Sequence, residues 1–222
     1  EMFRIDMRHI LGHTTEFWDF SAELTDLAEV VVNTAYHLCH EDLRSVHGSP
    51  LLESGELSDM AVCALGKCGG RELGFASDIE LMLIYGDQGR TDGDEPLDNG
   101  EFFSRMALAL GRFIETKREG IFRVDLRLRP HGNAGPAGVS LESFCRYYGP
   151  GGSAHSYERL ALTRLRAVAG DEVLGRQVER LRDEFVYEMR AIDTEELRRL
   201  RERQFEEKAG GARYNAKFSP GA

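Results

Sequence analysis

A glycine turn followed by a strand that begins with two acidic residues constrains this fold most strongly. The segment GKCGGRELGFASDIELMLIY, residues 66–85, combines the turn, a short helical stretch and an otherwise apolar strand over 78–85. Side chains two positions apart on a strand point to the same face, so Asp78 and Glu80 present their carboxylates together. Like charges this close repel each other unless a cation lies between them. We therefore interpret the pair as oxygen ligands of Mg²⁺ or Mn²⁺.

Hydrophobic periodicity predicts further elements around this strand. Apolar residues recur at helical spacing over 20–44 and 101–117, which predicts two amphipathic helices. The apolar stretch MAVCAL, residues 60–65, predicts a second buried strand. The acidic, glycine-rich segment 86–100 predicts an exposed loop, and IFRVDLRLRP, residues 121–130, alternates strictly and predicts a third strand.

The composition changes beyond residue 150. Residues 155–209 are rich in Arg, Glu and Leu at helical spacing and show no strand pattern. We therefore expect three parts: an N-terminal helical segment (1–50), a mixed α/β domain with a small mixed sheet (51–150) and a C-terminal helical domain (151–222). The chain of 222 residues starts without an initiator Met, and we expect it to be a fragment of a longer protein.

Composition excludes several classes of function. The net charge of −10 argues against a nonspecific nucleic-acid binder and against a protein that coats anionic membranes. No apolar run approaches the roughly 18 residues of a membrane span. Four cysteines in a chain of this length make no disulfide framework. We expect a cytoplasmic protein with neither a membrane nor a nucleic acid as partner.

A third acid lies on the strand predicted over 121–130. Asp125 is the only acid on the polar face of this strand, which it shares with Arg123, Arg127 and Arg129. A carboxylate from a neighbouring strand can bridge two metal ions, so we expect Asp125 to complete a triad with the two acids of the first strand. Arg127 and Arg129 could clamp phosphate oxygens, whereas we interpret Arg123 as a solvated residue of the sheet edge.

The glycine turn supplies a candidate anion site. Backbone N–H groups at Gly69 and Gly70, just before a short helix, can form an anion-binding turn. Taken alone these glycines would be an ordinary turn, and Asp78 and Glu80 alone would be solvated acids at a strand end. Together with Asp125 and the arginines they indicate metal-dependent phosphoryl or nucleotidyl transfer.

Two motifs of this chain match a known family. The pattern GKxGGxEL-x3-SD-x-(D/E)-L, followed by FRVDLRLRP-x-G-x-x-GP, resembles the glutamine synthetase adenylyltransferase family, which belongs to the DNA polymerase β-like nucleotidyltransferase superfamily. The likeness continues through SLESFCRYY (140–148), YERLALTRLRAVAGD (157–171) and LR-x-x-FVY at 181–187. It covers most of the chain, and its central motifs are highly specific.

The resemblance implies a fold and an activity. The family has two nucleotidyltransferase domains: one attaches AMP from ATP to a tyrosine of glutamine synthetase, and the other removes it by phosphorolysis, giving ADP. FRVDLRLRP, YERLAL and FVY resemble the N-terminal, adenylyl-removing half more closely. The implied fold for 51–150 is a polymerase β-like nucleotidyltransferase domain, flanked by N-terminal helices and a C-terminal helical domain. The implied partners are glutamine synthetase and a nitrogen-signalling protein of the PII type.

The resemblance also implies roles for single residues. Asp78, Glu80 and Asp125 would be catalytic and would hold Mg²⁺ or Mn²⁺. The nucleotide, ATP or ADP, would contact a second set of residues: Gly69, Gly70, Ser77, Arg127 and Arg129.

The chain departs from the family pattern at several positions. Glu80 stands where Asp is usual, Cys68 where Leu is usual and Tyr157 where Trp is usual. Two alternatives therefore stay open: a nucleotidyltransferase with another acceptor, such as a uridylyltransferase or a small-molecule transferase, and a non-catalytic regulatory module that binds nucleotide.

Overall fold

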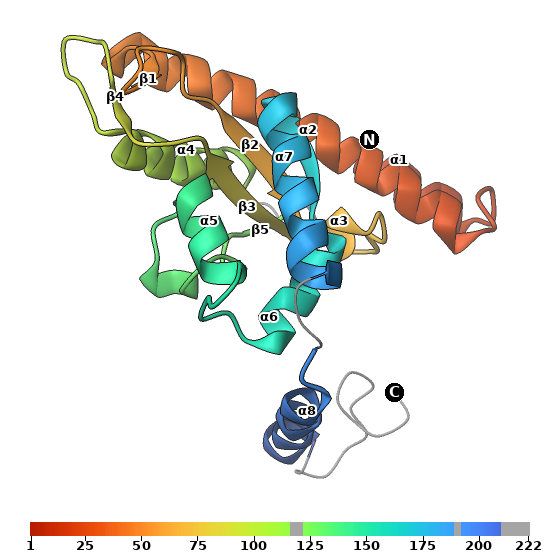
Figure 1. Cartoon of the computed structure of the whole chain (residues 1–222). Coiled ribbons are helices and arrows are strands. Elements are labelled where there is room, and N and C mark those ends of the chain that lie inside the picture. The colour runs from red at the N-terminus through yellow and green to blue at the C-terminus, as the bar shows by residue number, and fades with distance from the viewer. Residues whose placement is uncertain (116–121, 189–191, 210–222) are drawn as a thin grey trace.

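The computed structural model describes residues 1–115, 122–188 and 192–209, and Figure 1 shows how its elements are arranged. The helices are α1 (Met2–Ile10), α2 (Phe17–His47), α3 (Gly66–Gly69), α4 (Asn99–Ile114), α5 (Leu141–Tyr148), α6 (Ser156–Ala161), α7 (Glu172–Asp183) and α8 (Thr194–Ala209). The strands are β1 (Pro50–Leu52), β2 (Met60–Ala64), β3 (Ile79–Tyr85), β4 (Gly89–Thr91), β5 (Val124–Asp125), β6 (Gly138–Ser140) and β7 (Arg166–Gly170). Short 3₁₀ turns cover Gly132–Ala134 and Leu162–Arg164, and a π-helical turn, Glu184–Glu188, follows α7.

A five-stranded mixed sheet forms the centre of the fold. Its strand order is β5-β3-β2-β7, with β6 paired to a second stretch of β3. Strand β2 is antiparallel to both β3 and β7, whereas β5 and β6 are parallel to β3. Parallel neighbours need a crossover connection, and α4 lies in the one between β3 and β5. Strand β3 therefore lies at the centre of the sheet and pairs with β2, β5 and β6.

Helices cover both faces of this sheet. Alternate residues of β2 enter two hydrophobic cores: Met60 and Val62 pack with α1, α2 and α4, while Ala61 and Cys63 pack with α5 and α7. Figure 1 shows the sheet between these two groups of helices. By the same alternation, Glu80 lies on the α5 and α7 face of β3. Burial of both faces explains why the two central strands are continuous apolar runs.

Most of the elements predicted around the acidic strand are confirmed. Helix α2 contains the predicted helix over 20–44 and extends it at both ends, and α4 begins two residues before the predicted 101–117. Strand β2 matches the prediction over 60–65. The structure confirms a mixed α/β fold with a small mixed sheet and N-terminal helices, consistent with a polymerase β-like nucleotidyltransferase domain.

The third predicted strand is much shorter than its alternation indicated. Only Val124 and Asp125 pair with β3, and the described residues after Asp125 leave the sheet as a loop. The Arg127 side chain folds back on Asp125, and Arg129 donates to carbonyl groups of its own loop, so both side chains stabilise a turn instead of a strand. The prediction over 121–130 was therefore wrong beyond Asp125, and residue 121 lies outside the described residues.

Two further strand predictions were wrong. The expected loop over 86–100 contains β4, which pairs antiparallel with β1, and its last residues start α4. Residues 155–209, expected to contain no strand, contribute β7 to the sheet edge, where it pairs with β2. Short strands with small or charged residues, such as RAVAG, show little alternation of apolar and polar residues. Whether such a segment forms a strand depends on its pairing with another strand in the folded protein. The domain boundary at 150 stays a prediction.

Helix α8 is attached to the rest through its first turn. The Glu196 carboxylate accepts hydrogen bonds from the Ser156 backbone N–H at 3.1 Å and from the His155 ring at 2.9 Å. Figure 1 shows α8 beside α6, away from the sheet. None of the helices within the described part of the chain is long and apolar enough to cross a membrane.

Candidate active site

The predicted acids meet where β3 and β5 begin to pair. Glu80 and Asp125 are direct partners in the parallel register, so their side chains leave the same face of the sheet. The pairing is aligned by the Ile79 N–H, which donates to the Arg123 carbonyl at 2.8 Å. Asp78 lies one residue before β3 and is exposed. The structure thus brings the two strand acids together, with the third acid at the entrance to the strand.

Glu80 is partly buried, and its surroundings oppose ionisation. One carboxylate oxygen, Oε2, is buried and has no hydrogen-bond partner among the described residues. Burial raises the pKa of Glu80, and the negative charges of Asp125 and Asp78 raise it further. This carboxylate oxygen is buried, lacks a hydrogen-bond partner and lies close to two other acids. A bound cation would offset the repulsion between these negative charges.

Asp125 is held by Arg127 and not by the other acids. The Arg127 backbone N–H donates to Asp125 Oδ1 at 2.8 Å, and its guanidinium donates to both carboxylate oxygens at 2.6–3.0 Å. The hydrogen bonds from Arg127 lower the pKa of Asp125, which therefore stays ionised. The carboxylate side chain is 17% exposed and the arginine side chain 70%. The acid of this ion pair is therefore largely buried, while the arginine is exposed to solvent.

A cleft of about 420 Å³ opens beside these acids. Asp78 and Asp125 line it together with the three arginines predicted for the polar strand face: Arg123, Arg127 and Arg129. Glu80 does not line the cleft, because it lies deeper, against the start of α3. A cleft lined by both carboxylates and guanidinium groups can accept metal ions and phosphate together. Arg123, which the sequence did not assign to the site, belongs to this wall.

Comparison with known proteins decides the family. Residues 1–181 match the model of the family described as glutamate-ammonia ligase adenylyltransferase. The chain belongs to this family. The resemblance noted on the glycine-turn and FRVDLRLRP motifs is therefore confirmed.

Three curated relatives carry the name bifunctional glutamine synthetase adenylyltransferase/adenylyl-removing enzyme. The protein of Thioalkalivibrio sulfidiphilus is 41% identical over 84% of this chain and 19% of its own length. That of Bordetella pertussis is 37% identical over 80% of this chain and 20% of its own length. That of Nitrosococcus oceani is 35% identical over 100% of this chain and 23% of its own length. The chain spans about a fifth of the length of these relatives.

The glycines of the family motif have packing roles in this structure. The N–H groups of Gly69 and Gly70 donate to the Leu65 and Gly66 carbonyls within the turn. A Cβ on Gly69 would stand 1.9 Å from the Arg164 carbonyl oxygen, so only glycine fits there. This close approach explains Gly69 without a ligand, whereas a Cβ on Gly70 would meet nothing closer than 3.4 Å; the role of both glycines in nucleotide binding stays a prediction.

Ser77 and Arg129 are likewise engaged by the protein itself. The Ser77 hydroxyl accepts a hydrogen bond from the Gly74 N–H at 3.0 Å, which closes the turn before Asp78. The Arg129 guanidinium donates to the Pro136 carbonyl at 2.9 Å and to the Gly135 carbonyl at 3.2 Å. Arg129 also lines the cleft, so it shapes the wall whether or not it touches phosphate, and nucleotide contact by either residue stays a prediction.

An arginine that sequence reasoning missed holds the family's glycine turn in place. The Arg166 side chain on β7 donates hydrogen bonds to the Cys68 carbonyl at 3.2 Å and the Gly69 carbonyl at 3.1 Å. Both carbonyls lie at the end of α3. Arg166 also forms an ion pair of 2.6 Å with Glu29 on α2. Arg166 lies within YERLALTRLRAVAGD, so that motif had marked the region but not this role.

The acids fit a divalent cation by donor type, and their grouping is looser than a closed metal centre. Within 1–115, 122–188 and 192–209, no three side chains of His, Cys, Asp or Glu are grouped closely enough to hold a metal ion. The donors are nevertheless carboxylate oxygens, which suit Mg²⁺ and Mn²⁺, and Glu80 Oε2 lacks a partner among the described residues.

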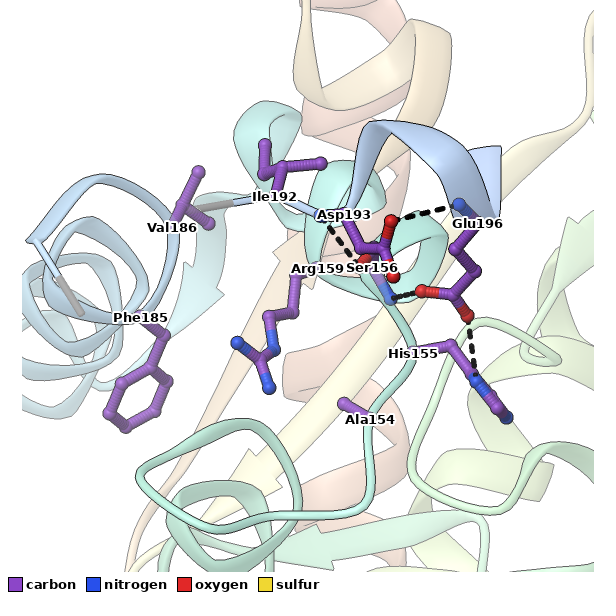
Figure 2. Close-up of a pocket in the computed structure, with 9 residues that line it drawn as sticks. All are labelled: Ala154, His155, Ser156, Arg159, Phe185, Val186, Ile192, Asp193 and Glu196. Carbon is purple, nitrogen blue, oxygen red and sulfur yellow. Dashed lines mark hydrogen bonds and ion pairs between the residues drawn. The ribbon is translucent and has the colours of Figure 1, made fainter. Parts of the chain in front are cut away.

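A separate cavity of about 140 Å³ lies between α6, the π-helical turn after α7 and the start of α8, and it shares no lining residue with the cleft. Figure 2 shows the Arg159 guanidinium pointing into it between Phe185 and Ala154, with Asp193 and Glu196 on the opposite wall. The dashed lines in Figure 2 include the bonds that the Glu196 carboxylate accepts from His155 and Ser156 and the bond that the Asp193 backbone N–H donates to the Ser156 hydroxyl, which together tie the start of α8 to the start of α6. This cavity therefore belongs to the helical junction and not to the acid cleft.

Proposed function

We propose that this chain is a metal-dependent nucleotidyltransferase domain that removes AMP from, or attaches AMP to, a tyrosine of glutamine synthetase, and so regulates nitrogen assimilation in the cytoplasm. The observation that supports it best is the pairing of Glu80 with Asp125 beside a cleft lined by arginines. The names of the curated relatives, which contain glutamine synthetase, support it as the protein substrate. A regulator of the PII type, expected from the resemblance, stays a prediction.

Each acid has a distinct part in this proposal. Asp78, Glu80 and Asp125 would hold Mg²⁺ or Mn²⁺, and ions bound there would neutralise phosphate charge and activate the attacking oxygen. Arg127 would move from Asp125 to the phosphate oxygens, because its guanidinium is exposed and pairs with phosphate as readily as with carboxylate. That exchange would free the Asp125 oxygens for the metal.

We assign the removing direction on the FRVDLRLRP, YERLAL and FVY stretches, which resemble the adenylyl-removing half. In removal, an oxygen of orthophosphate bonds to the phosphorus of the AMP group and the bond from phosphorus to the tyrosyl oxygen breaks. The tyrosyl oxygen takes up a proton, and ADP leaves. In attachment, the tyrosyl oxygen bonds to the α-phosphorus of ATP, pyrophosphate leaves and the hydroxyl proton is released.

The test incubates the chain with adenylylated glutamine synthetase, Mg²⁺ and phosphate and measures ADP. A parallel reaction holds unmodified synthetase and ATP. ADP that appears only with both phosphate and metal supports removal, and AMP attached in the parallel reaction supports attachment instead. Absence of turnover in both, with nucleotide binding intact, would contradict the proposal and favour another acceptor or a regulatory module.

A further inference from the structure

A second, smaller cavity adjoins the acid cleft. Its volume is about 130 Å³, and it shares two lining residues with the cleft, Asp78 and Arg123. Asp78 therefore stands between two spaces of different character. The cleft is lined by arginines and suits phosphate. The smaller cavity adjoins it at Asp78, so it could hold the group that reacts with a phosphate bound in the cleft.

The walls of the smaller cavity are mostly apolar and come from four separate segments. Met2 of α1, Leu24 of α2, Ala76 of the turn before β3 and Phe122 before β5 contribute them. Leu24 and Phe122 are 2% and 6% exposed, so these walls belong to the packed core. An apolar cavity of about 150 Å³ is large enough to take up benzene, which sets the scale for one aromatic ring here.

One acid on the cavity wall is left without a partner. Asp6 of α1 lines the cavity, and its Oδ1 is buried with no hydrogen-bond partner among the described residues. A buried acceptor that makes no hydrogen bond costs about 1–3 kcal/mol, so a donor that enters the cavity and reaches this oxygen would be favoured. A hydroxyl group on a ligand inside the cavity would be such a donor.

The geometry points to this cavity as the pocket for the phenol side chain that carries or receives AMP, an inference that rests on the proposed function. A tyrosine ring would lie between Met2, Leu24 and Phe122, with its oxygen directed to Asp6 and Asp78, two acids that line the cavity. At Asp78 the oxygen would face the cleft, where the α-phosphorus of a bound nucleotide would lie. The same pocket serves attachment and removal, because the tyrosyl oxygen is bonded to that phosphorus on one side of either reaction.

A binding test that requires no turnover uses small probes. N-acetyl-tyrosinamide is titrated into the chain labelled with ¹³C-methyl methionine, with N-acetyl-phenylalaninamide as the probe that lacks the hydroxyl. We expect the tyrosine probe to shift the Met2 methyl signal and to bind several-fold more tightly than the phenylalanine probe. Equal binding of the two probes, absence of a Met2 shift, or competition of adenosine for this cavity would overturn the inference.

Two variants connect the cavity to catalysis. Asp6→Leu removes the acceptor, and Met2→Trp fills the space from a position that is only partly buried; Asp19→Leu, an exposed acid of α2, is the matched control. We expect both cavity variants to raise the KM for glutamine synthetase about tenfold and to leave the Kd of ADP within twofold, with the control unchanged. Since Met2→Trp keeps every core residue, it stays informative even if Asp6→Leu does not fold.

The two proposals fail in different ways. If the wild-type chain turns over glutamine synthetase while both cavity variants keep its KM, the pocket assignment is wrong and the proposed function stands. If the wild-type chain shows no turnover in either direction but the tyrosine probe binds at Met2, the proposed function is wrong and the phenol pocket stands.

Discussion

The carboxylate of Glu80 lies directly against the backbone of Gly66. A Cβ on Gly66 would stand 2.7 Å from both the carboxyl carbon and Oε2 of Glu80, and the φ of Gly66 is +50°. The first residue of α3 must therefore be free of a side chain for two reasons: its backbone is left-handed, and the acid occupies the space. The turn and the acid are parts of one local structure.

Comparing Gly66→Ala with a second glycine variant should distinguish the effect of the left-handed backbone from the effect of displacing Glu80. The left-handed backbone of Gly66 predicts a loss of about 1–2 kcal/mol in the free energy of unfolding, and Glu80 should be displaced from its position. The control is Gly55→Ala, which has a φ of +86° and nothing within 4 Å of a new Cβ. We expect similar losses of stability in urea unfolding but an AMP-transfer rate at least tenfold lower in Gly66→Ala alone. Equal rates would mean that the position of Glu80 is unimportant.

Asp78→Asn and Asp125→Asn should abolish AMP transfer and leave the fold intact, since each removes one negative charge from a partly open cleft. Circular dichroism checks the fold, and ADP release checks the activity. Glu115→Gln is the matched control because Glu115 lines the same cleft outside the three acids. Turnover at the wild-type rate in either aspartate variant would contradict the triad.

Glu80→Asp should retain activity, because it restores the residue that is usual in the family and keeps a carboxylate on the same face of β3. The measurement is the Mg²⁺ dependence of both turnover and melting temperature, since a ligand at 100 times its Kd stabilises the folded state by about 2.7 kcal/mol. An inactive variant that still melts at a higher temperature in Mg²⁺ would indicate that the longer side chain sets the reactive geometry here.

In metal-free buffer, the difference in free energy of unfolding between Glu80→Gln and wild type should depend on pH. Burial and the neighbouring acids raise the pKa of Glu80 in the folded state above its unfolded value. The stability that this group contributes is therefore fully present below the unfolded pKa, and it is lost as the pH rises through the raised folded value. Glutamine does not titrate, so the variant should gain stability relative to wild type as the pH rises above the ordinary glutamate pKa of about 4. Added Mg²⁺ should reverse that gain, and a difference independent of pH would contradict the burial of this carboxylate.

Arg166→Ala should loosen the glycine turn from a distance. The variant loses hydrogen bonds to two carbonyls and leaves Glu29, whose side chain is 24% exposed, with one fewer cation. Hydrogen bonds of charged groups predict a loss of about 1–3 kcal/mol in the free energy of unfolding. Arg176→Ala, which breaks an exposed pair with Glu172, is the control and should change it by less than about 0.5 kcal/mol. Similar losses in the two variants would refute the anchoring role.

The sequence predicts the parts of this fold that hydrophobic periodicity can report. Helices α2 and α4 bury one long face each, and β2 and β3 are buried on both faces, so their patterns are strong. Strand β7 is short and only partly buried, and its pairing with β2 is a tertiary event. Alternation overestimated β5 because the arginines after Asp125 have the polar-apolar spacing of a strand while their side chains stabilise a turn.

The site shows the same division. Asp78, Glu80 and Asp125 were predicted from residue type and spacing; the structure pairs Glu80 with Asp125 in the strand register, and their roles stay a prediction. The ion pair between Arg127 and Asp125 follows a backbone turn that no pattern encodes. Asp6 lies far from the motifs in sequence, and Arg166 lies in a motif far from the glycine turn; only the packing of α1 and β7 brings them to the cavity and the turn.

The parallel pairing of β3 with β5 has a consequence for how the protein is made. Glu80 and Asp125 become neighbours only after the crossover through α4 has closed, and such contacts between distant residues form late and slowly. During synthesis the strand with the first two acids leaves the ribosome well before the third. The nascent chain therefore passes through a stage in which β2 and β3 are present but β5 is not, and the acids proposed to bind metal come together only when β5 docks.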